Sequence, residues 1–267
     1  MKSIAQLSDL TGRKALLTGG TGHIALAAAE ALVELGGAVA IADLDVEACR
    51  SRAAALDRMR RGAAIAVPCD LADETATRAA VRQTVAAFGG LDIVIHCAAL
   101  VGTTQVNGWA VPFEEQTVAA WDAAMRVNLT AAFVLTQEAR SALDRSGRGS
   151  VILFSSIYGM SGPDLSLYDG TTMANPGGYG ASKGGLLQLT RYLATVLAPA
   201  IRVNAISPGG VLRNQPPLFV ERYEARTPLK RMAREEDVKG AVAYLASDLS
   251  AYVTGHNLVL DGGWTAW

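Results

Sequence analysis

The segment that most constrains the fold is 14–35, which joins a short apolar run, a glycine-rich turn and a helical pattern. Residues 14–17 suit a buried strand, and residues 26–35 carry apolar side chains at helical spacing. Glycines permit a tight turn and a close approach to a pyrophosphate, and a helix N-terminus offers free N–H groups to that anion. An ordinary strand-to-helix turn is the alternative. The cofactor contacts predicted here are Gly19, Thr21, Gly22, His23 and Ile24.

The rest of the chain repeats this alternation. Short Val/Ile/Leu runs alternate with alanine-rich helical stretches, which is the α/β pattern, and hydrophobic residues make up 50% of the chain. No linker or internal repeat divides residues 1–267, so one domain is predicted. The expected fold is a Rossmann-like, doubly wound parallel sheet of about seven strands with helices on both faces. The predicted strands are 14–17, 38–42, 64–67, 91–96, 150–154, 201–206 and 257–260.

Asp43 ends the second apolar run and points to the choice of cofactor. A carboxylate at this place accepts hydrogen bonds from both adenosine ribose hydroxyls and repels a 2′-phosphate. No Lys or Arg follows until Arg50, and none lies in the glycine turn. These features favour NAD(H) over NADP(H). The alternative is that Asp43 caps a helix beginning near Val46.

Tyr179 and Lys183 are four residues apart in a helical pattern. Side chains at i and i+4 are neighbours on a helix, so the ammonium can sit beside the phenol. A free tyrosine has a pKa of about 10, and a nearby positive charge would lower it toward neutral pH. Taken alone the pair is a weak motif, because two ordinary helix residues give the same spacing.

Together these motifs resemble the short-chain dehydrogenase/reductase family, in its smaller single-domain branch. The strand 151–156 ends in Ser156, the segment 202–209 ends in Pro208 and Gly209, and Asp261 precedes two glycines, all as in that family. The resemblance implies catalytic roles for Asn128, Ser156, Tyr179 and Lys183. It also implies cofactor contacts at Asp70, Leu71, Ala98, Tyr179, Lys183, Pro208, Gly209 and Val211.

Two departures from the smaller branch stand out. His23 and Ala25 occupy positions that are usually glycine, and 96–99 reads His-Cys-Ala-Ala where Asn-Asn-Ala-Gly is usual. Both changes are closer to the extended branch that acts on nucleotide sugars. We interpret the side chains of His23 and His96 as structural.

Two loops, 156–178 and 209–230, are expected to determine the substrate, since loops at such places carry specificity. The first contains an added polar stretch at 162–176, which fits a hydroxylated substrate, and the arginines of the second could meet a carboxylate or phosphate. The alternative for each of these polar residues and arginines is that it lies on the solvated surface. The predicted substrate residues are Asp164, Tyr168, Asp169 and Arg213.

These features predict an NAD-dependent oxidoreductase that interconverts a secondary alcohol and a ketone through a Ser-Tyr-Lys group. A polyol, sugar or sugar-derived alcohol is the favoured substrate. The alternatives are a ketoacyl-type or hydroxysteroid-type reductase and a non-catalytic dinucleotide sensor. A nucleotide-sugar epimerase or dehydratase is a lesser option, because the chain lacks room for that branch's substrate domain.

Composition limits the partners to a small-molecule substrate and further copies of the chain. Net charge is −1, so no nucleic-acid surface is indicated, and no continuous apolar run approaches the ~20 residues of a membrane span. The N-terminus lacks a signal-peptide core, so a cytoplasmic location is expected. Three scattered cysteines predict free thiols and no metal site. The resemblance implies a homotetramer, with Trp264 and Trp267 expected at a subunit interface.

Overall fold

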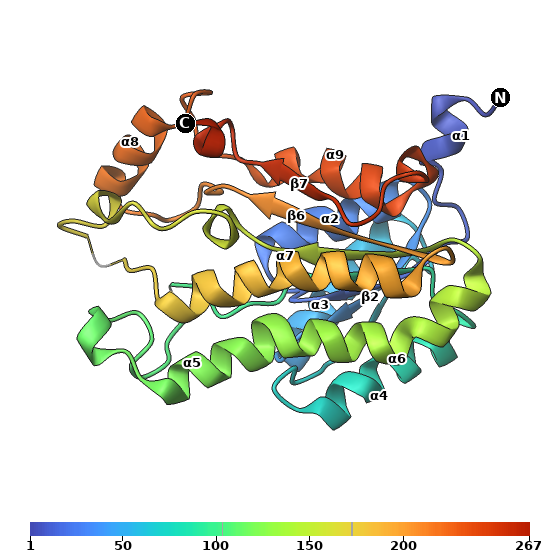
Figure 1. Cartoon of the computed structure of the whole chain (residues 1–267). Coiled ribbons are helices and arrows are strands. Elements are labelled where there is room, and N and C mark those ends of the chain that lie inside the picture. Colours follow the sequence, from blue (N-terminus) through green and yellow to red (C-terminus); the bar gives the residue numbers. More distant parts are fainter. Residues whose placement is uncertain (103, 172) are drawn as a thin grey trace.

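The computed structural model describes residues 1–102, 104–171 and 173–267, and its centre is a seven-stranded sheet (Figure 1). All strands are parallel, in the order β3-β2-β1-β4-β5-β6-β7. The predicted fold class is therefore confirmed. The strands are β1 (Lys14–Thr18), β2 (Ala38–Ala42), β3 (Ala64–Ala66), β4 (Ile93–His96), β5 (Gly149–Phe154), β6 (Ile201–Pro208) and β7 (Asn257–Leu260).

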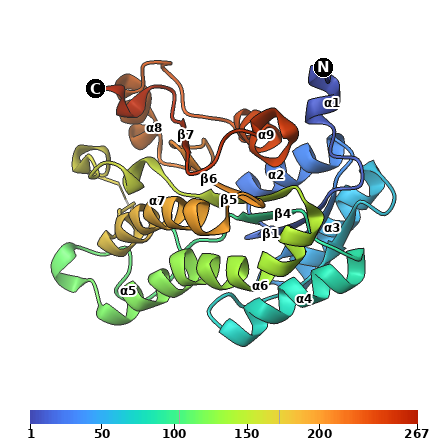
Figure 2. The same cartoon turned by 45° about the vertical axis from the view of Figure 1, so that its right-hand side comes forward.

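Helices connect the strands and cover both faces of the sheet (Figure 2). The α-helices are α1 (Ile4–Ser8), α2 (His23–Glu34), α3 (Val46–Met59), α4 (Glu74–Phe88), α5 (Val118–Met125), α6 (Ala131–Ser146), α7 (Gly177–Leu197), α8 (Pro217–Arg226) and α9 (Glu235–Ala246). Short 3₁₀ turns are η1 (Phe113–Glu115), η3 (Ile157–Gly159), η4 (Leu165–Leu167), η5 (Asp248–Ser250) and η6 (Trp264–Ala266), and η2 (Arg126–Thr130) is a π-helical turn.

The side chains of the strands divide the core into two layers. Successive residues of a strand point to opposite faces, so Leu17 and Ile95 pack with α2, α3 and α9. Leu16 and Val94, one position earlier in each strand, pack with α4, α6 and α7. Both faces are buried, which is why these strands read as continuous apolar runs and not as an alternating pattern.

The strand order reverses between β1 and β4. Thr18, the last residue of β1, pairs with Ala42 of β2 on one side and with His96 of β4 on the other. Because the two halves of the sheet wind in opposite directions from this point, a crevice opens at the carboxyl ends of β1 and β4. The candidate site lies at this edge.

His96 is fully buried at this edge and joins three parts of the chain. Its Nδ1 lies 2.9 Å from Thr18 Oγ1, and its Nε2 lies 3.1 Å from the main-chain oxygen of Asn128 in η2. A carbonyl can only accept, so Nε2 carries the proton and Nδ1 accepts from the threonine hydroxyl. Burial lowers the pKa of His96 to about 3, and the charge of Lys183 acts in the same direction. These bonds support the structural interpretation of His96.

Among the described residues, one helical stretch, Val118–Ser146, contains an 18-residue window that is apolar and long enough to cross a membrane by length and composition alone. The sequence prediction missed it because charged residues interrupt its apolar runs. In the fold, α6 packs against α4, and α5 packs against α7. This stretch is therefore a core helix of the domain.

We predict that His96 makes the protein sensitive to acid. The folded state holds a neutral imidazole, so its stabilising contribution is present above the ordinary histidine pKa of about 6.5 and is lost as pH falls toward the folded pKa. The free energy of unfolding should decrease by up to about 1.4 kcal/mol per pH unit between about pH 6 and pH 4 through this group. Urea denaturation across this range measures the slope.

His96→Asn should flatten that pH dependence, because asparagine does not titrate. His256→Asn is the matched control, since His256 is exposed and should leave the slope unchanged. An equal slope in wild type and His96→Asn would contradict the assignment.

Candidate active site

The turn between β1 and α2 is suited to an anion. Gly19 has φ of +68°, and a Cβ there would lie 2.6 Å from the Cα of Ala98, so only glycine fits. Gly22 is the N-cap of α2, and no side chain caps this end of the helix. The first main-chain N–H groups of α2 are therefore not bonded to a capping side chain, and they can hold a pyrophosphate.

Asp43, at the end of β2, is bonded to this turn. Its Oδ2 accepts hydrogen bonds from the Thr21 main-chain N–H at 3.0 Å and from Thr21 Oγ1 at 2.6 Å. Its Oδ1 accepts from the N–H of Leu44 at 2.7 Å. The N-cap of α3 is Asp45, which accepts from the N–H of Ala48 at 2.9 Å. The alternative that Asp43 caps this helix is therefore wrong.

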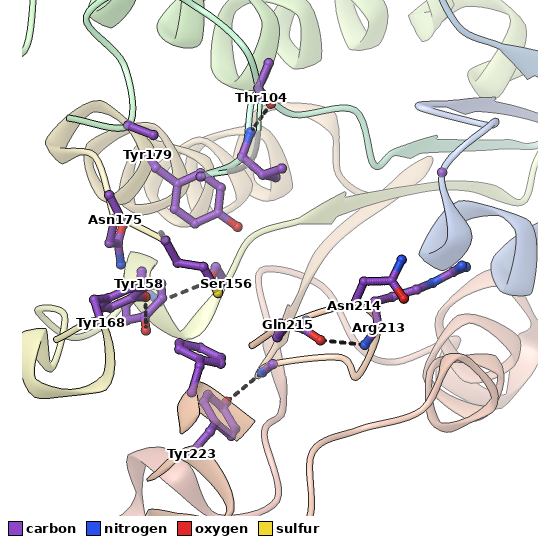
Figure 3. A pocket seen from close by; sticks show the side chains of 18 of the residues that line it. Thr104, Ser156, Tyr158, Tyr168, Asn175, Tyr179, Arg213, Asn214, Gln215 and Tyr223 are labelled. Atoms are coloured by element: carbon purple, nitrogen blue, oxygen red, sulfur yellow. Dashed lines mark hydrogen bonds between the residues drawn. The ribbon is translucent and has the colours of Figure 1, made fainter. Parts of the chain in front are cut away.

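A cavity of about 1080 Å³ runs from the glycine turn to the carboxyl end of β5 (Figure 3). The predicted site residues that line it are Thr21, Gly22, His23, Ser156, Tyr168, Tyr179, Gly209 and Arg213. The predicted site residues outside its lining are Gly19, Ile24, Asp43, Asp70, Leu71, Ala98, Asn128, Asp164, Asp169, Lys183, Pro208 and Val211.

Ser156, Tyr179 and Lys183 meet at one wall, as the sequence predicts. Ser156 caps η3, and Tyr179 lies in the first turn of α7 with Lys183 one turn later. Lys183 Nζ is 5.7 Å from the centroid of the Tyr179 ring and donates to the main-chain oxygen of Phe154 at 2.7 Å. The ammonium therefore lies below the phenol ring, and its hydrogen bond goes to the end of β5.

Burial controls the protonation of this group. It raises the pKa of Tyr179 to about 12, with the Ser156 hydroxyl acting in the opposite direction. Burial also lowers the pKa of Lys183 to about 8. The pKa of Tyr179 is therefore raised and not lowered as the sequence predicts, because desolvation disfavours the phenolate, and Lys183 is not among the causes that shift it. At pH 7 the phenol is neutral and the ammonium is mostly charged.

Asn128 and two serines fix α7 relative to the sheet. The Asn128 side chain accepts from the N–H of Leu100 at 2.7 Å and donates to the oxygen of Leu100 at 3.2 Å and to Ser182 Oγ at 3.0 Å. Ser155 Oγ donates to the main-chain oxygen of Lys183 at 2.8 Å. All polar positions of the Asn128 amide are occupied, so this side chain positions the helix that carries Tyr179.

The first part of the added stretch, residues 164–169, folds against α8. Asp164 caps η4 and forms an ion pair with Arg226 of α8 at 2.5 Å. Arg222 donates to the main-chain oxygen of Asp169 at 2.6 Å. The structure therefore does not bring the carboxylates of Asp164 and Asp169 to the cavity as predicted, because arginines of α8 hold this part of the loop. Of the polar residues predicted for this loop, Tyr168 does line the cavity.

An apolar cluster joins the two substrate loops to the C-terminus. Leu167, Phe219, Tyr223 and Trp264 are all buried in it, and the rings of Tyr223 and Trp264 stack 4.3 Å apart. The prediction that Trp264 lies at a subunit interface is therefore wrong, because its own chain covers it. Trp267 is 73% exposed.

Arg213 lies on the cofactor side of the cavity, not on the substrate side. It pairs with Glu235 at the start of α9 at 2.8 Å. Burial lowers the pKa of the neighbouring His23 imidazole, and the positive charge of Arg213 lowers it further. Figure 3 shows the guanidinium directed toward the end of α2, away from Tyr179. The predicted contact of Arg213 with substrate is thus not supported by its position.

The sequence analysis missed several residues of the cavity. Tyr158 follows Ser156 by two positions, and that spacing after the active-site strand is a signal that could have found it. Phe219 and Asn175 lie within the two loops predicted to determine the substrate, although neither was among the predicted substrate residues. Arg52 of α3 also lines the cavity, and within the described part of the chain it makes no hydrogen bond or ion pair.

Comparison with known proteins places this site in context. Residues 21–265 match the family model described as enoyl-(acyl carrier protein) reductase. Cis-4-hydroxycyclohexanecarboxylate dehydrogenase of Sinomonas cyclohexanicum is 34% identical over 95% of this chain and 97% of its own. The probable galactose dehydrogenase GalD of Rhizobium meliloti is 32% identical over 97% of both chains. A gluconate 5-dehydrogenase from Burkholderia cenocepacia, solved with NADP and tartrate, superposes with a TM-score of 0.87 at 28% identity, covering 99% of this chain and 100% of that one.

Proposed function

This chain belongs to the short-chain dehydrogenase/reductase family, and on that premise we propose that it is an NAD(H)-dependent oxidoreductase interconverting a secondary alcohol and a ketone. The observation that carries the proposal is the meeting of Ser156, Tyr179 and Lys183 beside a cavity that begins at an anion-binding turn. The proposed substrate is a polyol, sugar or sugar-derived alcohol. GalD and the gluconate dehydrogenase are named for such compounds, which supports this class.

The three side chains divide the proton chemistry among them. In the reductive direction Tyr179, whose pKa is about 12, gives its proton to the forming alcohol oxygen. Ser156 donates a hydrogen bond to the same oxygen and holds it beside the phenol. The nearby ammonium of Lys183 stabilises the phenolate once the proton has left, and oxidation reverses these steps. The bound nicotinamide supplies or accepts the hydride.

The proposed cofactor site uses the carboxyl ends of the strands. The N–H groups at the start of α2 hold the pyrophosphate, and Asp43 accepts from the adenosine ribose. Asp70 and Leu71 follow β3 and would meet the adenine, as the family resemblance implies. Pro208, Gly209 and Val211 follow β6 and would lie beside the nicotinamide. Asn128 acts by positioning α7, and the family resemblance implies that it also anchors a water that links Lys183 to solvent.

Tyr179→Phe tests the catalytic assignment. Removing one hydroxyl deletes the acid–base group but little binding area, so kcat should fall by about 100-fold or more while the Kd for NADH changes by less than about twofold. Stopped-flow turnover and NADH fluorescence titration measure the two effects. A screen of polyols, sugar derivatives, hydroxy acids and steroids with NAD supplies the substrate and separates the alcohol dehydrogenase from the reductase alternatives.

Tyr252→Phe is the matched control, because Tyr252 is fully exposed and lies outside the cavity. It should behave as wild type. Turnover by Tyr179→Phe above about a tenth of wild type would reject Tyr179 as the acid–base group.

Asp43 should set a preference for NAD over NADP. Asp43→Ala removes both the ribose hydrogen bonds and the repulsion of a 2′-phosphate, so the ratio of catalytic efficiencies should shift toward NADP by roughly tenfold or more. Glu47→Ala is the matched control, because it also removes a carboxylate, but one that is exposed on α3 and paired with Arg50. The ratio should be unchanged in that variant. Equal or better use of NADP by wild type would overturn the assignment.

We also propose a cytoplasmic homotetramer. One apolar face lies on α5, α6 and α7, where the exposed side chains are Trp121, Phe133 and Tyr192. A second lies at the β7 edge of the sheet and the C-terminus, where the exposed side chains are Val259 and Trp267. Two separate apolar faces would provide the two interfaces that a tetramer with dihedral symmetry needs. Light scattering should then give four times the chain mass of 27.9 kDa. A monomer at micromolar concentration would contradict the proposal.

A further inference from the structure

Three polar side chains meet at the end of the cavity that lies away from the glycine turn. Tyr158 of η3, Tyr168 at the end of η4 and Asn175 before α7 lie together there, and we call them the polar corner (Figure 3). All three line the same cavity as Ser156 and Tyr179. The main-chain N–H of Tyr158 donates to Ser156 Oγ at 3.2 Å, so the corner is built directly onto the residue proposed to hold the reacting oxygen.

The polar corner contains hydrogen-bond donors that no group of the described chain accepts. The hydroxyls of Tyr158 and Tyr168 are 2.8 Å apart, so one O–H is used between them and the other remains free. The Nδ2 of Asn175 is buried and has no hydrogen-bond partner within the described chain, although the amide lies close enough to Tyr168 to favour its phenolate. A buried donor without an acceptor costs about 1–3 kcal/mol. The corner is therefore incomplete until a ligand brings an oxygen.

The surroundings of the corner are apolar. Met173, Phe219 and Met232 line the cavity and pack in one cluster with Tyr158 and Tyr168, and the ring of Phe219 lies 5.5 Å from that of Tyr168. Such walls favour a compact carbon skeleton with few hydroxyls over a fully hydroxylated open chain, because buried hydroxyls without partners are costly.

No positive charge serves the corner. Among the described residues that line the cavity, the arginines are Arg52 and Arg213. Arg52 comes from α3, next to the proposed ribose site, and Arg213 pairs with Glu235 and points toward α2. A carboxylate at the corner would be desolvated without a cation, and that is unfavourable. The corner therefore suits an uncharged oxygen.

We propose that Tyr158, Tyr168 and Asn175 bind a second, uncharged oxygen of the substrate, so that the preferred substrate is a compact ring alcohol with a neutral hydroxyl, ether or carbonyl oxygen across the ring. This inference rests on the proposed function and narrows it. The alcohol oxygen lies at Ser156 and Tyr179, the carbon ring contacts the apolar wall, and the distal oxygen accepts from the corner. A long acyl chain and a distal carboxylate are both disfavoured.

Binding measurements test the inference without turnover. Wild-type protein saturated with NADH is titrated by NMR with cyclohexane-1,4-diol, cyclohexanol and cis-4-hydroxycyclohexanecarboxylate. The diol should bind roughly tenfold more tightly than cyclohexanol, since one or two hydrogen bonds from neutral donors are gained. The carboxylate should bind no better than cyclohexanol. The proposal would be overturned if the carboxylate bound more tightly than cyclohexanol. It would also be overturned if the diol bound no more tightly than cyclohexanol, or if neither bound detectably.

Variants locate the effect. Tyr168→Phe and Asn175→Leu keep the volume of the side chain and remove donors, so each should weaken the diol severalfold, up to about tenfold, and leave cyclohexanol unchanged. Tyr252→Phe, at a fully exposed position outside the cavity, is the control and should change neither ligand. Equal weakening of both ligands would mean that the residues only shape the loop, which would overturn the proposal.

The same variants separate this inference from the proposed function. With NAD, Tyr168→Phe should raise KM for the diol and leave kcat nearly unchanged, because the corner does not touch the reacting oxygen. A protein that binds the diol through the corner but oxidises no alcohol would refute the proposed function and keep the inference. Oxidation of both alcohols with equal KM would refute the inference and keep the function.

Discussion

The structure depends on a chain of buried hydrogen bonds at the crevice where the sheet reverses direction. Thr18 donates to His96, His96 donates to the main-chain oxygen of Asn128, and the Asn128 amide donates to Ser182 of α7. Each link joins a different element: β1, β4, η2 and α7. Because unpaired polar groups at such depth are costly, the chain of bonds allows one arrangement of α7 on the sheet. The positions of Tyr179 and Lys183 follow from that arrangement.

The loop after β5 and the segment around α8 form one unit, in which charged residues of the two segments bind each other. Arg222 and Arg226 reach across from α8 to the polar stretch that contains Asp164, while Phe219 and Tyr223 on the same helix join the buried cluster with Trp264. Charges that could have faced a substrate are used to hold the two loops together. The described part of the loop after β5 contributes the tyrosine hydroxyls of Tyr158 and Tyr168, the amide of Asn175 and apolar side chains to the cavity.

The cavity is thereby divided electrostatically. At the end near α2, the helix N-terminus and Arg213 provide positive potential, and Asp43 is held by Thr21 at a fixed place. At the other end, the phenols of Tyr158 and Tyr168 carry no charge, because burial raises the pKa of each. A charged, phosphate-bearing ligand and a neutral one therefore have separate ends of one cavity, and they meet at Ser156 and Tyr179.

Local features of the sequence were enough to predict the seven strands, the glycine turn and the wall formed by Ser156, Tyr179 and Lys183, because each depends on periodicity or on spacing within one element. They could not show that Arg226 would neutralise Asp164, that Arg213 would turn toward α2, or that burial would raise the pKa of Tyr179. Those outcomes join residues far apart in the chain, and the partner of a charged side chain and its exposure to water exist only once the elements have packed. The sequence by itself thus determined the fold and the position of the proposed proton-transfer group, whereas the tertiary structure decided which polar side chains remain free to meet a ligand.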